Sequence, residues 1–119
     1  MTLNEIRKIL KAGILTEKND LDVSIEWAYC ADLMSDVLAY SVTGCLLITG
    51  LTNTQVIRTA EVAGLRAVVF VQDKRPDIRT IALAEEKHIP LLATNYSTFE
   101  TCGKLFEKGL RSRHYLKVI

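Results

Sequence analysis

Residues 45–55, with the sequence CLLITGLTNTQ, decide the fold. The stretch begins with four apolar residues in a row, a pattern typical of a strand that is buried on both faces. Thr49 and Gly50 then indicate a turn, and Thr52 and Gln55 have the spacing of a capping box at the start of a helix. The stretch therefore predicts a buried strand, a turn and a helix, which is the first half of a parallel βαβ unit.

The same pattern recurs twice further along the chain. Apolar runs occupy residues 67–71 (AVVFV) and 90–93 (PLLA), and each is followed by a helix-start signal. The signals are a Pro-Asp pair at residues 76–77 and a second capping box over residues 97–100. Because strands and helices that alternate in this way form right-handed βαβ units, we expect an α/β fold. It should have three layers, α/β/α, around a mostly parallel central sheet.

The N-terminal third predicts smaller elements. Thr2 opens a capping box for a first helix, which should end near Gly13 and be followed by a short strand over residues 14–16. Apolar and polar residues alternate over residues 23–30, as in a strand with one wetter face. Asp32 is expected to cap a short helix after that strand.

Length and composition indicate one globular domain. The 119 residues are 49% apolar and 24% charged, which is enough to build a core and excludes a disordered chain. We expect a single domain over residues 1–119, with a core over residues 6–110 and a basic tail over residues 111–119, either frayed or forming a terminal strand. The net charge of +1 argues against a nucleic-acid or membrane-surface partner.

That net charge hides two opposed blocks. Residues 17–36 carry six acidic side chains and one lysine, whereas residues 104–119 carry five basic side chains and one glutamate. We hypothesise that the basic tail docks on an acidic surface, either its own or a partner's.

No signal peptide is apparent, and we expect a cytoplasmic protein. Residues 37–57 lack charged side chains and are long enough to cross a bilayer, but their glycine, threonine and asparagine residues indicate a helix end, a strand and a helix start. The three cysteines, Cys30, Cys45 and Cys102, include no Cys-x-x-Cys pair and predict neither a disulfide framework nor a zinc site. We expect buried free thiols, with a reactive or redox-sensing thiol as the alternative.

The loops after the three apolar strands are the candidate ligand site, because open α/β sheets bind ligands beyond the carboxyl ends of their strands. Helix N-termini at this edge favour anions. The candidate ligand-binding residues are Thr49, Gly50, Thr52, Asn53, Gln72, Asp73, Thr94 and Asn95. The alternative is structural: Thr52 and Ser97 would be helix caps, and Gly50 and Asn95 turn residues.

Motifs for catalysis are missing from the sequence. It contains neither G-x-x-x-x-G-K-[ST], nor G-x-G-x-x-G, nor G-x-S-x-G, and His88 and His114 have no metal-ligand spacing. We therefore expect no catalytic residues, no cofactor, no metal and no enzymatic activity. A small phosphate-transfer or hydrolytic enzyme that uses the strand-end loops is the alternative.

Four segments together resemble the DRTGG domain. They are residues 35–40 (SDVLAY), 44–50 (GCLLITG), 66–71 (RAVVFV) and 89–92 (IPLL), and the resemblance spans about residues 6–110. This family is similar to the N-terminal domain of HPr kinase/phosphorylase and has copies inside phosphotransacetylases and CBS-domain pyrophosphatases. The resemblance implies a small α/β/α module that accompanies catalytic or sensor domains, often at subunit contacts, without established catalysis of its own.

The resemblance is incomplete in the loops that give the family its name. Thr49 and Gly50 match the motif, whereas residues 51–52 replace an acidic/basic pair and residues 72–73 replace a glycine pair. A kinase function does not carry over, because the kinase domain is absent. We expect a stand-alone regulatory or assembly module, a homodimer, that senses a small anionic or nucleotide ligand and acts on a separately encoded enzyme or kinase.

Overall fold

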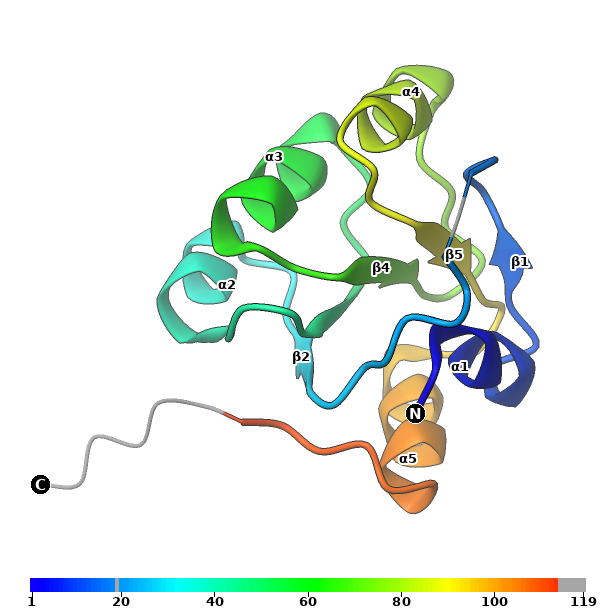
Figure 1. Cartoon of the computed structure of the whole chain (residues 1–119). Coiled ribbons are helices and arrows are strands. Elements are labelled where there is room, and N and C mark those ends of the chain that lie inside the picture. The colour runs from blue at the N-terminus through cyan, green and yellow to red at the C-terminus, as the bar shows by residue number, and fades with distance from the viewer. Residues whose placement is uncertain (19, 114–119) are drawn as a thin grey trace, which may run out of the picture.

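The computed structural model describes residues 1–18 and 20–113. Over these residues, helices and strands alternate along most of the chain (Figure 1). In chain order the elements are α1 (Leu3–Ile9), β1 (Gly13–Ile14), β2 (Ala28–Cys30), α2 (Met34–Tyr40), β3 (Leu46–Thr49), α3 (Thr54–Ala63), β4 (Ala67–Phe70), α4 (Ile78–Glu86), β5 (Leu91–Ala93) and α5 (Thr98–Glu107).

The strands form one sheet in the order β1-β5-β4-β3-β2. The four strands from β2 to β5 are parallel to one another, and β1 adds to β5 in the antiparallel sense, with Gly13 opposite Ala93. The prediction of a mostly parallel sheet is therefore confirmed. The carboxyl ends of the four parallel strands meet at one edge of the sheet, where their following loops lie close together.

Helices cover both faces of the sheet, with α2, α3 and α4 on one face and α1 and α5 on the other (Figure 1). The alternation of side chains along β3 shows how the two cores form. Leu46 and Ile48 belong to the core beneath α1 and α5, whereas Leu47 belongs to the core beneath α2 and α3. The three-layer α/β/α architecture predicted from the continuous apolar strands is thus confirmed.

Several predicted helix starts have the expected caps. The Thr2 hydroxyl accepts a hydrogen bond from the amide of Glu5 at 3.1 Å, and the Asp77 carboxylate accepts one from the amide of Thr80 at 2.9 Å. Ser97 caps α5 in a complete capping box. These bonds satisfy amides that a helix N-terminus otherwise leaves free.

Two cap predictions are wrong. The side chain of Asn53, one residue after Thr52, caps α3 by accepting from the amide of Gln55. Asp32 does not cap α2, which starts after Leu33 without a side-chain cap. The carboxylate of Asp32 has other partners at the end of β3, described below, and this competition removes it from the helix.

The N-terminal elements are shorter than predicted. Helix α1 ends at Ile9, and Lys11 turns the chain with a φ of 48°, so that Gly13 lies in β1 rather than at a helix end. Only residues 28–30 of the alternating segment pair with β3. The part before them is held against the N-terminus, where the amide of Leu3 donates to the carbonyl of Val23 at 3.0 Å.

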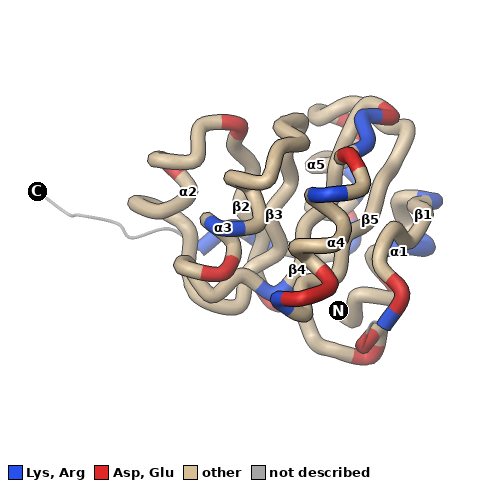
Figure 2. The backbone as a smooth tube through the Cα atoms, turned by 90° about the horizontal axis from the view of Figure 1, so that it is seen from above, with Lys and Arg blue, Asp and Glu red and all other residues tan. Residues whose placement is uncertain are grey.

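The charged residues of the described chain lie on helices and loops, whereas the tube is free of charge along β3, β4 and β5 (Figure 2). An ion pair of 3.1 Å between Lys87 and Glu61 joins the ends of α4 and α3. Among residues 1–18 and 20–113, no helix has the length and apolar character needed to span a bilayer.

The described part of the basic tail lies on the outer edge of β2. The amide of Ala28 donates to the carbonyl of Arg111 at 3.0 Å. The Arg111 guanidinium stacks on the ring of Phe106 at 4.0 Å, and that of Arg113 lies 5.7 Å from the ring centre of Trp27. The tail is therefore held here by backbone and aromatic contacts. The remainder of the predicted tail, residues 114–119, lies outside the described residues.

Candidate functional site

Backbone hydrogen bonds join the three predicted site loops into one surface at the carboxyl edge of the sheet. The amide of Val71 donates to the carbonyl of Thr49 at 3.1 Å and links the first loop to the second. The amides of Gln72 and Asp73 donate to the carbonyls of Tyr96 and Thr94, at 2.8 and 3.0 Å, and link the second loop to the third. The three loops that carry the eight predicted residues thus lie side by side at this edge.

The hydroxyls of Thr49 and Thr94 are already bonded within the protein. Both residues are buried, and each hydroxyl accepts from the amide two residues further on, Leu51 or Tyr96. Thr94 also donates to the carbonyl of Leu10 at 2.7 Å. The repeated threonine therefore shapes two equivalent turns, and both hydroxyls are engaged within the protein.

The turn after β4 has an unusual backbone. Gln72 and Asp73 have φ angles of 60° and 56°, and the amide of Lys74 closes the turn on the carbonyl of Val71 at 3.1 Å. Residues with a side chain adopt this left-handed conformation at a cost of about 1–2 kcal/mol each. Glycine adopts it easily, and these are the two positions where the family resemblance implies a glycine pair. Strain of this kind is concentrated at functional sites.

The strained turn places Lys74 next to Gly50. A Cβ atom on Gly50 would lie 3.4 Å from the Lys74 ammonium and 3.7 Å from the Asp32 carboxylate, so the missing side chain allows both groups to approach. The Asp32 carboxylate accepts from the amide of Gly50 at 2.8 Å and from the hydroxyl of Thr49 at 3.0 Å. A cation and a carboxylate thus flank the backbone at the end of β3.

The third loop contributes an aromatic ring, and neighbouring segments add further cations. A small pocket of about 250 Å³ is lined by Lys11, Tyr96 and Asn95 together with the buried Leu10 and Thr94. The ammonium of Lys104, on α5, lies 4.6 Å from the centre of the Tyr96 ring. Asn95 is exposed at the mouth of this pocket. The chemistry available here is aromatic stacking next to positive charge, which suits a base and a phosphate.

Two other predicted residues, Thr52 and Asn53, lie at the start of α3. Asn53 is occupied in capping α3, and Thr52 is partly buried beside it. Sequence reasoning did not select Asp32, Lys74, Lys11 or Tyr96. Asp32 follows a parallel neighbour of β3 and therefore reaches the same edge, but the alternating pattern of residues 23–30 obscured that pairing.

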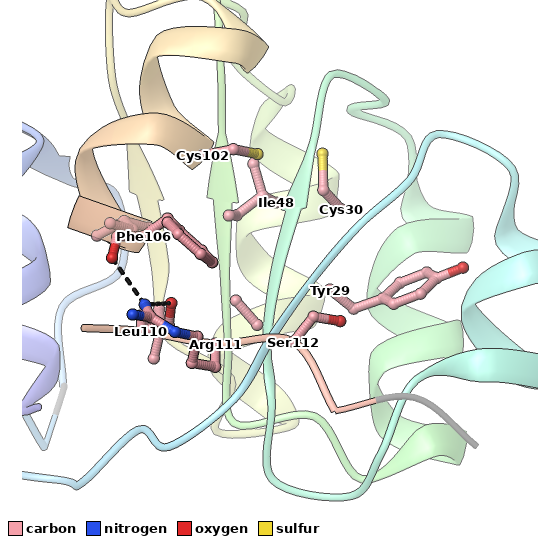
Figure 3. Close-up of a pocket in the computed structure, with 10 residues that line it drawn as sticks. Tyr29, Cys30, Ile48, Cys102, Phe106, Leu110, Arg111 and Ser112 are labelled. Carbon is pink, nitrogen blue, oxygen red and sulfur yellow. Dashed lines mark hydrogen bonds between the residues drawn. The ribbon is translucent and has the colours of Figure 1, made fainter. Parts of the chain in front are cut away.

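A second pocket, of about 280 Å³ and mostly apolar, lies between the end of β2 and α5 (Figure 3). Cys30 and Cys102 line it, together with Phe106, Leu110 and the described part of the tail. Of the three cysteines, only Cys45 is buried as expected; Cys30 is exposed and Cys102 is half-buried. The prediction of three buried thiols is therefore wrong for this pair, because the strand edge at Cys30 is left open.

Comparisons with known proteins agree with the fold. No curated protein matches the chain. Among solved structures, it is similar to the CBS and DRTGG domains of the regulatory region of Clostridium perfringens pyrophosphatase, crystallised with the activator diadenosine tetraphosphate. The TM-score is 0.75 at 15% identity, and the match covers 87% of this chain and 45% of that one. The family model for the DRTGG domain matches residues 5–107. The chain belongs to the DRTGG domain family.

Proposed function

We propose that this chain is a regulatory module, one domain with a core over residues 6–110, that binds an anionic nucleotide at the carboxyl edge of its sheet. The strained turn at residues 72–73 carries the proposal, because it sets the Lys74 ammonium against the backbone of Gly50. Ligand occupancy would change the loop surface offered to a separately encoded enzyme or kinase. The similar pyrophosphatase region, which contains CBS domains as well as a DRTGG domain, was crystallised with a dinucleotide activator, and this supports a nucleotide as the ligand to test first.

The charges and rings of the surface favour a nucleotide over a simple anion. Lys74 and Arg75 follow the strained turn, and Lys11 and Tyr96 line the neighbouring pocket. The hydrogen bonds from Gln72 and Asp73 to the third loop make these two groups parts of one surface. A base stacked on the ring would leave its phosphates near the lysines, as binding of a mono- or dinucleotide requires.

Replacing Lys74 by alanine tests this site. Loss of a phosphate-binding cation should weaken nucleotide binding at least about tenfold, equivalent to ~1.4 kcal/mol. Calorimetric titration with AMP, ATP, diadenosine tetraphosphate and inorganic pyrophosphate measures the effect. Lys108→Ala is the matched control, because this exposed lysine lies at the other end of α5 from the carboxyl edge.

The same titration separates the alternatives. If none of the four compounds binds or raises the melting temperature of the wild-type chain, the ligand-sensing part of the proposal fails and an assembly role remains. Equal losses of nucleotide affinity in Lys74→Ala and Lys108→Ala would show a non-specific effect of charge. Release of phosphate from any compound at a rate that depends on Lys74 would instead support the alternative, a small enzyme.

We also propose that the module is a homodimer, formed through the exposed aromatic side of α5, next to the apolar pocket that Phe106 lines. Phe99 and Phe106 are two turns apart on this helix and are 87% and 60% exposed. Exposed aromatic side chains that share one face mark interaction surfaces. Sedimentation should show Phe99→Asp to be at least about tenfold weaker in self-association, whereas Val62→Asp on α3 should leave it unchanged. A wild-type chain that stays monomeric at high concentration would refute the dimer.

A further inference from the structure

Two cysteines from distant parts of the sequence meet at the apolar pocket beside β2. Cys30 is the last residue of β2, and Cys102 lies on the sheet-facing side of the second turn of α5. Both side chains line the pocket, and Figure 3 shows their sulfur atoms on the same side of it. The third thiol, Cys45, is buried in the core under α2 and α3 and lies in a different layer.

The two thiols are chemically different. The neighbouring Cys30 side chain lowers the pKa of Cys102 to about 7. The same neighbour interaction, together with burial, raises the pKa of Cys30. The pair therefore offers one sulfur with thiolate character at neutral pH and one protonated partner next to it, which is the arrangement of an oxidisable cysteine and its resolving cysteine.

The surroundings favour thiol oxidation over metal binding. Cys30 is exposed and Cys102 half-buried, so a small oxidant can reach the pair from solvent. Within residues 1–18 and 20–113, no group of three or more His, Cys, Asp or Glu side chains is arranged to hold a metal ion. A structural zinc site needs four such ligands.

We propose that Cys30 and Cys102 form a redox-sensitive pair that closes to a disulfide when the chain meets a hydroperoxide. The Cys102 thiolate attacks the terminal peroxide oxygen and the O–O bond breaks. The products are a sulfenic acid on Cys102 and hydroxide from hydrogen peroxide, or an alkoxide from an organic hydroperoxide. The Cys30 sulfur then attacks the Cys102 sulfur, the S–O bond breaks, and a disulfide forms with release of water. A thiol reductant reverses the step by exchange. The proposal is independent of nucleotide binding.

Closure of this bond would join the end of β2 to α5. Cys30 lies two residues before Asp32, the carboxylate that holds the turn at Thr49 and Gly50. Oxidation therefore fixes the strand end from which one side of the candidate ligand site is built. Because the bond also closes a long loop of the chain, the melting temperature should rise by about 10 °C.

The first test maps the oxidised chain. The full chain is treated with hydrogen peroxide, digested without reductant and examined by mass spectrometry. A peptide that links Cys30 to Cys102 is expected in the wild type and in the matched control Cys45→Ser, together with the rise in melting temperature. Cys30→Ser and Cys102→Ser should show neither. Links between different chains alone, or a bond to Cys45, would overturn the proposal.

The second test follows the order of the two steps. In Cys30→Ser, peroxide should leave a sulfenic acid on Cys102 that dimedone traps, whereas Cys102→Ser should trap little. Alkylation of Cys102 by iodoacetamide should accelerate as pH rises through about 7 in the wild type, because the thiolate is the reactive form. In Cys30→Ser this midpoint should move to about 8.5, the ordinary thiol value. An unchanged midpoint would show that Cys30 does not activate Cys102.

Discussion

Replacing Phe70 by alanine is expected to lower the free energy of unfolding by about 3–5 kcal/mol, the largest effect of any change considered. Phe70 is fully buried at the end of β4, within the core beneath α3 and α4. Truncating its ring removes the contacts of the side chain and leaves a cavity that a close-packed core fills only in part. A domain of this size with a total stability of about 5–15 kcal/mol would lose a large share of it.

Urea unfolding measures this change, and the melting temperature should fall by more than about 10 °C. Val62→Ala is the control, because this side chain is 76% exposed on α3, outside the proposed dimer surface, and its removal should alter stability by less than about 0.5 kcal/mol. Comparable losses of stability in the two variants would contradict the assignment of Phe70 to the core and of Val62 to the surface.

Replacing Thr94 by valine is expected to cost about 2–3 kcal/mol, although the two side chains have nearly the same shape. The buried Thr94 hydroxyl donates to the Leu10 carbonyl at 2.7 Å and accepts from the Tyr96 amide at 3.3 Å. Valine fills the space but leaves both backbone groups without a partner, away from water. The loop that carries Asn95 and Tyr96 would also lose its fixed shape.

Two controls separate the hydroxyl from the volume of the side chain. Thr94→Ser keeps the hydroxyl and should recover most of the stability, whereas Thr52→Val, at a partly buried position, should change it by less than about 0.5 kcal/mol. If Thr94→Ser were destabilised and Thr94→Val were as stable as the wild type, packing of the methyl group would be the main contribution. Such a result would contradict the role of the hydrogen bonds in shaping the turn.

The layers of this fold could be predicted because its strands carry a strong local signal. Residues 46–49 and 67–70 are buried along their whole length, and a continuous apolar run of that kind fits only a sheet covered on both faces. Strand β2 lacked this signal, because it pairs with only one strand of the sheet and its residues are partly buried or exposed. Its pairing with β3 depends on the fold as a whole and not on the residues of β2.

The candidate site was predictable as a location and much less so as a set of side chains. Parallel strands bring their carboxyl ends together, so the loops over residues 49–53, 72–73 and 94–95 lie at one edge, while ligand binding by these residues stays a prediction. The sequence does not show which hydrogen-bond partner a side chain selects when several are possible. The Asp32 carboxylate could have capped a helix or accepted hydrogen bonds from a turn. Only the folded chain shows that it accepts from Thr49 and Gly50.

The short outer strands of this sheet have a consequence for aggregation. Segments such as LLIT and AVVF combine high β-propensity with no charge, and exposed copies of such segments stack into cross-β fibrils. In the native sheet they lie inside, bordered by the two-residue β1 on one side and by the three-residue β2 on the other. Strands of this length offer few unpaired backbone groups to which another chain could add a strand. The rate of fibril formation should therefore increase with the fraction of chains that are unfolded.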